Sequence, residues 1–465
     1  MKFISTRSGI SASGPETVFQ GLAPDGGLFL PLPDAMPKAE GVDLSSLGAA
    51  ERFVIGALFD DFPSEVREEA IDRLLSRFPV NDPIPLREVD GLHLLELFHG
   101  RTGAFKDVAL SMLPVFMRHA ALGKRVLILT ATSGDTGSAA MQGFAGVDGT
   151  EIIVYYPASG TSRIQKLQMT TPSEPNVHAV GIRGNFDDAQ AAVKRIFASQ
   201  AMKESAAQAG VTLSSANSIN TGRLVPQIAY YMLAGARLGG SDFDVVVPSG
   251  NFGNILAAYY AKRLGSPIGE LVVASNVNDV LARFVKTGVY EPGEKFTVTN
   301  SPSMDIRISS NVERLLWMLN YDGDVAAACS EVCRLMSDLK AKGRYELTDA
   351  AKARLFADFR GGVATPGETE AEMRRLEEKC GYLVDPHTAV ATFVAKKLGY
   401  PKAGRPAVVA ATATPYKFPE TCARAFGRDV LVNPPPAFAE LERLPIVQTR
   451  TVDLAGIDAT VSELL

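Results

Sequence analysis

One lysine of this 465-residue chain stands in an unusual setting for a charged residue. In HGRTGAFKDVAL, residues 99–110, Lys106 follows Phe105 and precedes Asp107 within a largely apolar stretch. A lysine shielded from water loses its proton more easily, and its amine can then attack an aldehyde to form an imine. The more common alternative is a lysine whose apolar stem packs on the protein while the amine reaches solvent. Lys106 is therefore a candidate nucleophile that needs a second signal.

A glycine-rich turn provides that signal. In VVVPSGNFGNILAAYY a strand is expected to end at Pro248, glycines follow at Gly250 and Gly253, and a helix is expected to begin near Asn254. Glycines let backbone N–H groups approach an anion, and a helix N-terminus favours negative charge, although a plain strand-to-helix turn has the same composition. Because the turn is neither GxGxxG nor GxxxxGK[ST], a phosphate bound here would not belong to a nucleotide held by those motifs.

A second polar turn, LILTATSGDTGSAA, also joins an expected strand to an expected helix. Its residues Thr132, Ser133, Gly134, Asp135 and Thr136 offer hydroxyl groups and backbone amides at the helix start, where they suit a carboxylate ligand. Asp135 could equally be an N-cap and nothing more.

The stretch SSANSINTGRLVPQ groups two amides, a hydroxyl and a guanidinium: Asn217, Asn220, Ser218 and Arg223. Together they could clamp a phosphate group. A capped helix with one exposed arginine is the simpler interpretation of this cluster alone. Combined with Lys106 and the glycine turn, however, the pattern suggests pyridoxal phosphate, which carries both an aldehyde for a lysine and a phosphate for a loop.

The elements that must position these residues alternate from about residue 94 onward. Short apolar, β-branched runs such as RVLILTAT, EIIVYYP, DFDVVVP and PAVVAATAT are each followed by a polar turn and a helical stretch. This alternation is typical of α/β proteins with parallel sheets covered on both faces, in which ligands bind beyond the carboxyl ends of the strands. The first ninety residues are expected to form turns and loops, with one helix in VREEAIDRLLSRF.

Composition excludes several classes of protein. The chain has 46% hydrophobic and 21% charged residues and a net charge of −5, with no basic run that would suggest nucleic acid. It shows neither an apolar secretory region nor a membrane-length apolar segment, so we expect a cytoplasmic protein without a membrane partner. Four cysteines do not make a disulfide framework; Cys329 and Cys333 are expected as reduced core residues, and no metal-ligand spacing occurs.

Several ordered motifs resemble the threonine synthase family of pyridoxal-phosphate lyases. They are GLAPDGGLFLP, HGRTGAFKD, TSGDTG, NSIN with the following arginine, GNFGN, SPSMDIRISSNVERL and DPHTAVA, and they extend from Ser5 to past Phe418. The resemblance implies fold type II: two doubly wound, mainly parallel-sheet α/β domains with an N-terminal α/loop segment. It divides the chain into an N-terminal segment (1–93), a smaller domain with the lysine and substrate loop (94–225), and a larger domain with the cofactor phosphate loop (226–465).

The resemblance also implies a role for each motif residue. Lys106 corresponds to the Schiff-base lysine and general base, Asp135 to the residue beside the cofactor's O3′, and Thr412 to the hydroxyl that faces the pyridine nitrogen. A neutral hydroxyl there should favour elimination and replacement over transamination. The remaining matches are a cofactor-phosphate loop (Gly250, Asn251, Phe252, Gly253, Asn254), a substrate-carboxylate set (Thr132, Ser133, Thr136) and a substrate-phosphate set (Asn217, Ser218, Arg223).

The implied reaction converts O-phospho-L-homoserine and water to L-threonine and phosphate. Another fold type II lyase acting on a related phosphorylated or phosphonate amino acid, or a non-catalytic phosphometabolite-binding paralogue, remains an alternative. The sequence is compatible with a monomer or a homodimer.

Some positions depart from the family pattern, and others have simpler explanations. Arg101, Gly103, Ser8 and Thr414 are the departures. Ser310 and Glu313 have the spacing of a capping box before an apolar run. His387 could be a turn residue or a domain-contact residue.

Overall fold

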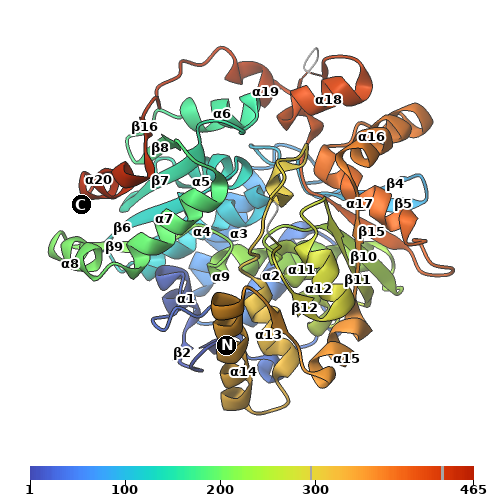
Figure 1. Ribbon diagram of the computed structural model, residues 1–465, viewed down its shortest axis with the longest axis horizontal. Helices are drawn as coiled ribbons and strands as arrows, with labels where there is room; N and C mark the ends of the chain where they lie inside the picture. The colour runs from blue at the N-terminus through green and yellow to red at the C-terminus, as the bar shows by residue number, and fades with distance from the viewer. Residues whose placement is uncertain (294–295, 431–433) are drawn as a thin grey trace.

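The computed structural model describes residues 1–293, 296–430 and 434–465, and its two main sheets stand side by side (Figure 1). The five-stranded sheet has the order β16-β8-β7-β6-β9 and is parallel throughout. The six-stranded sheet has the order β14-β11-β10-β15-β5-β4 and is parallel except for the β4–β5 pair. The mainly parallel α/β fold expected from the sequence is therefore confirmed.

Strand bounds in the five-stranded sheet are β6 (Arg125–Ala131), β7 (Thr150–Pro157), β8 (Val177–Ile182), β9 (Val211–Ser214) and β16 (Thr451–Val452). In the six-stranded sheet they are β4 (Leu86–Val89), β5 (Leu92–Glu96), β10 (Phe243–Pro248), β11 (Ile268–Ser275), β14 (Phe359–Val363) and β15 (Ala407–Ala411). A two-stranded ribbon pairs β12 (Val289–Tyr290) with β13 (Tyr345–Glu346).

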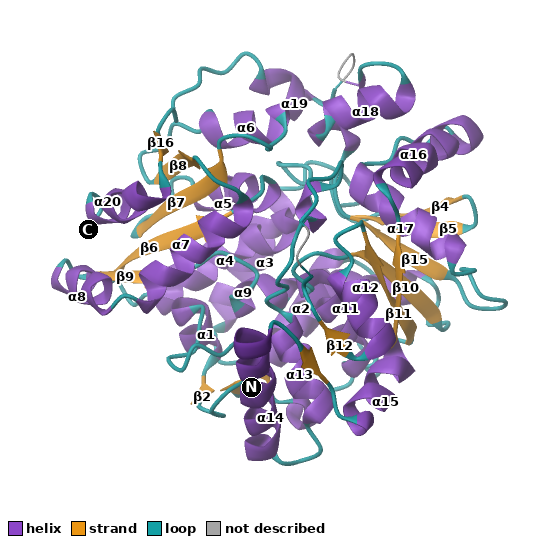
Figure 2. Cartoon of the chain, viewed as in Figure 1, coloured by secondary structure: helices purple, strands orange, loops and turns teal. Residues whose placement is uncertain are grey.

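Helices lie on both sides of each sheet (Figure 2). The helices before the glycine turn are α1 (Gly14–Gln20), α2 (Leu47–Leu58), α3 (Ser64–Ser76), α4 (Lys106–Ala120), α5 (Asp135–Phe144), α6 (Arg163–Thr170), α7 (Phe186–Ala198), α8 (Gln200–Gln208), α9 (Thr221–Leu224) and α10 (Pro226–Arg237). Those after it are α11 (Gly253–Arg263), α12 (Val280–Thr287), α13 (Val312–Asn320), α14 (Val325–Lys342), α15 (Asp349–Asp358), α16 (Pro366–Cys380), α17 (Pro386–Lys397), α18 (Pro419–Phe426), α19 (Pro436–Leu441) and α20 (Ile457–Ser462).

Alternate residues of β6 explain why this strand needs cover on both faces. Val126 and Ile128 belong to the core that includes α4 and α5, whereas Leu127 and Leu129 belong to a separate core with α7 and α20. Side chains of a strand point alternately to opposite faces, so a run that is apolar at every position must be buried on both. Within RVLILTA, the four residues 126–129 form such a run, and all four are buried.

The N-terminal segment contains more regular structure than the sequence indicated. The expected helix is α3, and α1 and α2 precede it. In addition, β1 (Phe3–Ser5) pairs antiparallel with β2 (Ser11–Ala12) and β3 (Phe29–Pro31). These strands are two or three residues long and lie beside Gly- and Pro-rich turns, so their alternation is too short to identify from sequence.

Membership of the two sheets does not follow the order of the chain. β4 and β5, from before residue 97, pair into the six-stranded sheet, and β16 returns to the five-stranded sheet from the far C-terminal region. The domain boundaries expected at residues 93 and 225 stay predictions.

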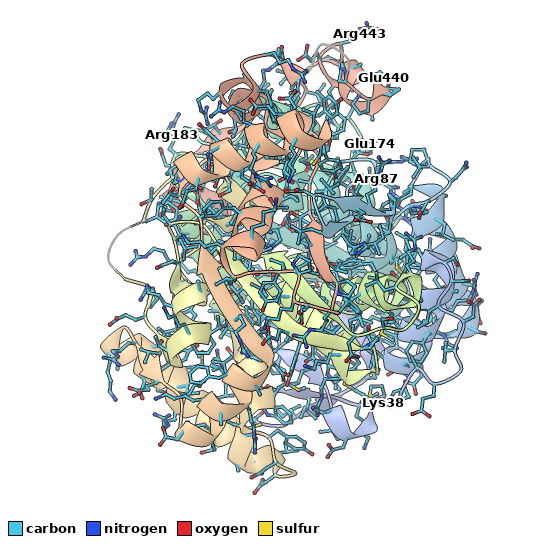
Figure 3. All side chains as sticks on the ribbon, turned by 90° about the vertical axis from the view of Figure 1, so that its right-hand side faces the viewer. Lys38, Arg87, Glu174, Arg183, Glu440 and Arg443 are labelled. Carbon is cyan, nitrogen blue, oxygen red and sulfur yellow. The ribbon has the colours of Figure 1, made fainter. Side chains whose placement is uncertain are left out.

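Charged side chains such as Lys38, Arg87, Glu174 and Arg443 are exposed and project from the surface (Figure 3). Across the described part of the chain, no helix is both long and apolar enough to cross a membrane. The cysteines are free; Cys329 is buried as expected, but Cys333 is exposed and was wrongly assigned to the core.

A buried carboxyl group lies in the core beneath α2. Glu51 is 0% exposed, and neither of its carboxyl oxygens has a hydrogen-bond partner within the described residues. Burial raises the pKa of Glu51 well above its ordinary value of 4.5. The folded protein therefore holds this carboxyl protonated, while the unfolded chain ionises it once the pH exceeds 4.5.

Replacing Glu51 by Met should stabilise the protein, and the gain should grow with pH. A raised pKa in the folded state means that the wild type loses stability as the pH rises above the unfolded value, and methionine removes this loss. We expect the free energy of unfolding to rise by about 1–3 kcal/mol at pH 8 and by less at pH 5, measured by urea denaturation. The matched control is Glu68→Met on α3, where the carboxylate is exposed. A Glu51→Met variant less stable than the wild type at both pH values would contradict the assignment.

Candidate active site

The carboxyl ends of four strands surround one narrow cavity of about 90 Å³. Its walls come from the turns after β6, β9, β10 and β15, which is where the sequence placed a ligand site. Every site residue expected from the sequence lines this cavity: Lys106, Thr132, Ser133, Asp135, Thr136, Asn217, Ser218, Arg223, Gly250, Asn251, Phe252, Gly253, Asn254 and Thr412. Residues up to 306 positions apart in the chain are thus brought together.

Lys106 is the first residue of α4, and its side chain is only 11% exposed. Its Nζ lies 3.4 Å from Asp135 Oδ2 and 4.4 Å from the centre of the Phe105 ring, so the amine does not reach open solvent. The Phe105 N–H donates to the Thr412 carbonyl over 2.9 Å, which fixes the start of α4 against the end of β15. Burial lowers the pKa of Lys106, and Arg223 and Lys417 lower it further against the opposing effect of Asp135.

Asp135 is not an N-cap. The N-cap of α5 is Gly134. The Asp135 carboxylate instead accepts hydrogen bonds from groups that line the cavity and from groups buried on its opposite side. Its Oδ2 faces Lys106 and accepts from Ser303 Oγ over 3.2 Å, and its Oδ1 accepts from Gln165 Nε2 over 2.8 Å. Although burial opposes ionisation, Lys417, Lys106 and other neighbours lower the pKa of Asp135 below its ordinary value. This carboxylate is therefore ionised.

Sequence reasoning missed four residues that complete this network: Gln165, Ser303, Lys417 and His387. Lys417 Nζ lies 3.1 Å from Asp135 Oδ1, and His387 lines the cavity with its Nε2 accepting from the Ser303 N–H over 3.1 Å. The motifs SPSMDIRISSNVERL and DPHTAVA contain Ser303 and His387, but their pattern carries no chemical signal, and Lys417 lies outside the motifs. Gln165 sits in an ordinary helical sequence that offers no signal.

The glycine turn is a close-fitting backbone cradle. A Cβ at Gly250 would lie 2.6 Å from the Ser303 carbonyl oxygen, and Phe252 adopts a left-handed φ of 63°. The α11 helix begins at Gly253, so its first N–H groups lack intrahelical partners. Asn251 Oδ1 and Asn254 Nδ2 are buried without a hydrogen-bond partner in the described structure. These are the properties of an anion-binding turn.

The simpler interpretation of this segment, a capped helix with an exposed arginine, is correct only in its first part. Asn220 caps the short α9 helix, but Arg223 is buried. The Arg223 side chain donates to the Ala216 carbonyl over 2.6 Å, and its Nε has no partner. Within residues 1–293, 296–430 and 434–465 no carboxylate forms an ion pair with it. Burial lowers the pKa of Arg223 to about 10, so it remains charged at neutral pH.

Ser218 and Asn217 flank this guanidinium with unequal freedom. Ser218 Oγ accepts from Asn311 Nδ2 over 3.1 Å, which leaves its O–H able to donate. The Asn217 amide exchanges hydrogen bonds with the backbone of Ala131, so one of its N–H bonds is already used to hold the loop against β6.

The Thr132 hydroxyl is hydrogen-bonded to backbone N–H groups at the start of α5. Its Oγ1 accepts from the N–H groups of Gly134 and Gly137, each over 2.9 Å, and its own O–H remains to donate. Ser133 and Thr136 are half-buried at the cavity wall.

Two of the four departures from the family pattern, Gly103 and Thr414, lie against each other. Gly103 has a φ of 71°, a Cβ there would lie 2.6 Å from Thr414 Cγ2, and the Thr414 N–H donates to its carbonyl over 3.0 Å. Ser8 donates to Asp25, and Arg101 is exposed. None of the four departures lines the cavity.

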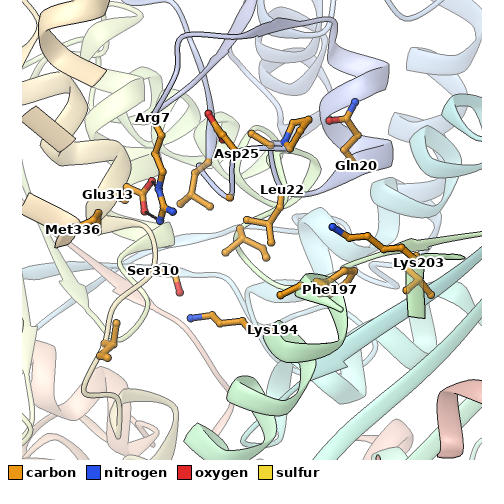
Figure 4. A pocket seen from close by; sticks show the side chains of 18 of the residues that line it. Arg7, Gln20, Leu22, Asp25, Lys194, Phe197, Lys203, Ser310, Glu313 and Met336 are labelled. Atoms are coloured by element: carbon orange, nitrogen blue, oxygen red, sulfur yellow. Dashed lines mark hydrogen bonds and ion pairs between the residues drawn. The ribbon is translucent and has the colours of Figure 1, made fainter. Parts of the chain in front are cut away.

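A separate, larger cavity of about 850 Å³ is lined by other residues (Figure 4). Arg7 and Glu313 form an ion pair in its wall, and Lys194 and Lys203 point into it. The Glu313 carboxylate binds Arg7 and Thr6, so the capping box expected with Ser310 is wrong even though α13 does begin nearby. The walls are mostly apolar, and none of the fourteen expected site residues lies in them.

The narrow cavity is therefore the candidate chemical site, because one of its buried charges lacks a partner of opposite sign. Lys106 and Lys417 lie beside the Asp135 carboxylate, whereas Arg223 is buried in the wall with no carboxylate partner among the described residues. Uncompensated buried charge is costly, so such a site is built to receive anions.

Comparison with known proteins agrees with this geometry. The family model described as pyridoxal-phosphate dependent enzyme matches residues 82–342, and a model described as threonine synthase, C-terminal, matches residues 388–461. A threonine synthase of Pseudomonas aeruginosa is 38% identical over 91% of this chain and 90% of its own length. The crystal structure of yeast threonine synthase superposes with a TM-score of 0.89 at 32% identity, covering 100% of this chain and 97% of that one.

A pyridoxal-phosphate-bound threonine synthase from Brucella melitensis superposes with a TM-score of 0.88 at 35% identity, over 100% of this chain and 99% of that chain. Sequence and fold agree along nearly the whole length, so the chain belongs to the threonine synthase family of pyridoxal-phosphate enzymes.

Proposed function

We propose that this protein converts O-phospho-L-homoserine and water to L-threonine and phosphate, with pyridoxal phosphate as cofactor. The observation that carries the proposal is the buried, carboxylate-free guanidinium of Arg223 in the same cavity as Lys106. A lyase of this fold without a phosphorylated substrate would need no second phosphate site besides the one at the glycine turn.

The residues present fit the cofactor. Its phosphate suits the N-terminal N–H groups of α11 and the unpartnered donor Nδ2 of Asn254. When bound, pyridoxal phosphate supplies an aldehyde for an amine and a ring that stabilises negative charge on the substrate. Thr412 would offer the ring nitrogen a neutral hydroxyl, which does not hold a proton there as a carboxylate would.

Lys106 would bind the cofactor covalently and then act as the general base. Its lowered pKa leaves more of the amine unprotonated near neutral pH, as removal of a proton from the substrate Cα requires. The same amine can move protons at Cβ and Cγ, because α4 holds it at a fixed place in a site shielded from solvent.

Arg223, with the Ser218 and Asn217 side chains, would bind the substrate phosphate and receive it when it leaves Cγ. A guanidinium with no carboxylate partner gives up no ion pair when it engages a phosphate, and charge-assisted hydrogen bonds are stronger than neutral ones. The hydroxyls of Thr132, Ser133 and Thr136 would orient the substrate carboxylate, so that water adds at Cβ after phosphate has departed.

We also propose a reducing, cytoplasmic compartment for this enzyme. The support is that its cysteines, Cys329, Cys333, Cys380 and Cys422, are all free thiols.

The decisive test is to incubate the cofactor-loaded enzyme with O-phospho-L-homoserine and to quantify phosphate and threonine together. We expect equal amounts of both, and neither from Lys106→Ala. L-Homoserine, which lacks the phosphate, serves as the control substrate. Phosphate released without threonine would refute the proposed product.

Replacing Arg223 by Met should separate function from stability. We expect kcat/KM for O-phospho-L-homoserine to fall at least about 100-fold, while the visible absorbance of the cofactor persists. Because the variant removes a buried unpaired charge, the thermal midpoint of the ligand-free protein should not fall. Arg237→Met, at an arginine paired with Asp82 on the surface, is the control and should keep its activity. An unchanged kcat/KM in Arg223→Met would exclude the phosphate role.

Two glycine substitutions should separate the effect of the loop's packing on protein stability from its effect on cofactor affinity. In Gly250→Ala the new Cβ meets the Ser303 carbonyl oxygen at 2.6 Å, so both thermal stability and cofactor affinity should fall. In Gly253→Ala the nearest atom is 3.4 Å away, so the ligand-free protein should keep its thermal midpoint. Its affinity for pyridoxal phosphate should still fall about tenfold, because a methyl group now stands where the phosphate approaches the backbone. Unaltered cofactor affinity in Gly253→Ala, measured by fluorescence titration, would argue against this loop as the phosphate site.

A further inference from the structure

Lys417 is buried behind the site. It ends the 3₁₀ turn Pro415–Lys417, is 0% exposed, and does not line the cavity. Its Nζ donates to the Thr102 carbonyl and to Gln168 Oε1, each over 2.8 Å, and lies 3.1 Å from Asp135 Oδ1. A lysine held by three acceptors on three segments cannot reach a substrate. Any influence it has on the chemistry must act through Asp135.

The two oxygens of Asp135 face different partners. Oδ1 is directed to the rear, where Lys417 and Gln165 hold it, and Oδ2 is directed to the cavity, where Lys106 and Ser303 lie. Lys417 therefore fixes the orientation of the carboxylate and leaves a single oxygen free for the site.

The negative charge of Asp135 is the reason that the Lys417 contact is needed. A carboxylate beside Lys106 favours the protonated amine, which cannot act as a base. Lys106 also faces Arg223 on α9, Asp135 faces His387 on α17, and Asp107 faces Lys417. Among these groups Lys417 is the one that contacts the far side of Asp135 directly.

We propose that Lys417 is a positioning residue that pairs with Asp135 as an electrically neutral unit, cancels the carboxylate's pull on Lys106, and so lets Lys106 give up its proton. This inference rests on the proposed role of Lys106. It also explains how the site tolerates an ionised carboxylate beside an amine that must lose its proton.

The test is a double-mutant cycle of Lys417→Met, Asp135→Asn and the double variant, read by the pH dependence of the visible absorbance of the Lys106-bound cofactor. Without Lys417, the charge of Asp135 is uncompensated, so the midpoint at which this chromophore loses its proton should rise by about one pH unit. Asp135→Asn should lower the midpoint, because Lys417 then acts alone. The double variant should return toward the wild type, because the neutral unit is restored.

A structural role alone would give a different result. If Lys417 only packs the Pro415–Lys417 turn, Lys417→Met changes the thermal midpoint without moving the absorbance midpoint, and Asp135→Asn does not rescue it. An unmoved absorbance midpoint in Lys417→Met, or a shifted midpoint that Asp135→Asn does not rescue, overturns the proposal. Lys166→Met, at an exposed lysine of α6, is the control and should leave the absorbance titration unchanged.

Two safeguards keep the test decisive. If Lys417→Met does not fold, the downward shift in Asp135→Asn and its reversal in the double variant still decide the question. The titration uses no phosphorylated substrate, so a failure of the proposed reaction would be recognised separately, by the absence of threonine in the assay.

Discussion

Buried positive charge without matching negative charge is the constraint on which this active site depends. Lys106 and Lys417 lie beside the Asp135 carboxylate, and Arg223 is buried in the same cavity wall without a carboxylate partner among the described residues. Such an arrangement is unfavourable in an empty protein, so we expect it to be stabilised when an anion enters. The fold accepts the cost because the large cores on both sides of each sheet contribute far more stabilisation.

The parallel sheets bring these charged side chains to one place. Each strand that ends at the cavity contributes one polar turn, and the strand directions bring those turns to a common edge without any turn being long. Helix starts then supply partial positive charge to the same place, as α11 does at Gly253. Residues with proposed roles toward the cofactor and toward the substrate consequently come from different strands and can vary independently.

Sequence reasoning succeeded where chemistry and local pattern coincide. Apolar runs such as RVLILTA predicted the buried strands, and the glycine turn after Pro248 predicted the cradle. It could not choose between alternatives that depend on distant contacts. Lys106 resembled a solvent-reaching lysine, Arg223 an exposed arginine and Asp135 a helix cap, and in each case burial by remote segments decided against the simpler interpretation.

The residues that were missed share one property: their partners lie far away in sequence. Lys417 is 282 positions from Asp135, and Ser303 is 168 positions from it, so no local spacing connects them. Glu313 has the spacing of a helix cap, but its carboxylate binds Arg7 306 positions away, because an ion pair was available there. Spacing rules describe what a segment can do alone, and tertiary contacts override them.

The interleaving of the two sheets governs how the chain can reach this structure. The smaller sheet gains its outer strand only when Thr451 and Val452 align with Gly181 and Ile182, while the larger one joins β5 to β15 across some three hundred residues. Contacts of such long separation are slow to form. During synthesis the larger sheet can therefore be completed only after Ala411 has left the ribosome, and the smaller sheet only after Val452. Until then their strand edges stay unpaired, which favours aggregation.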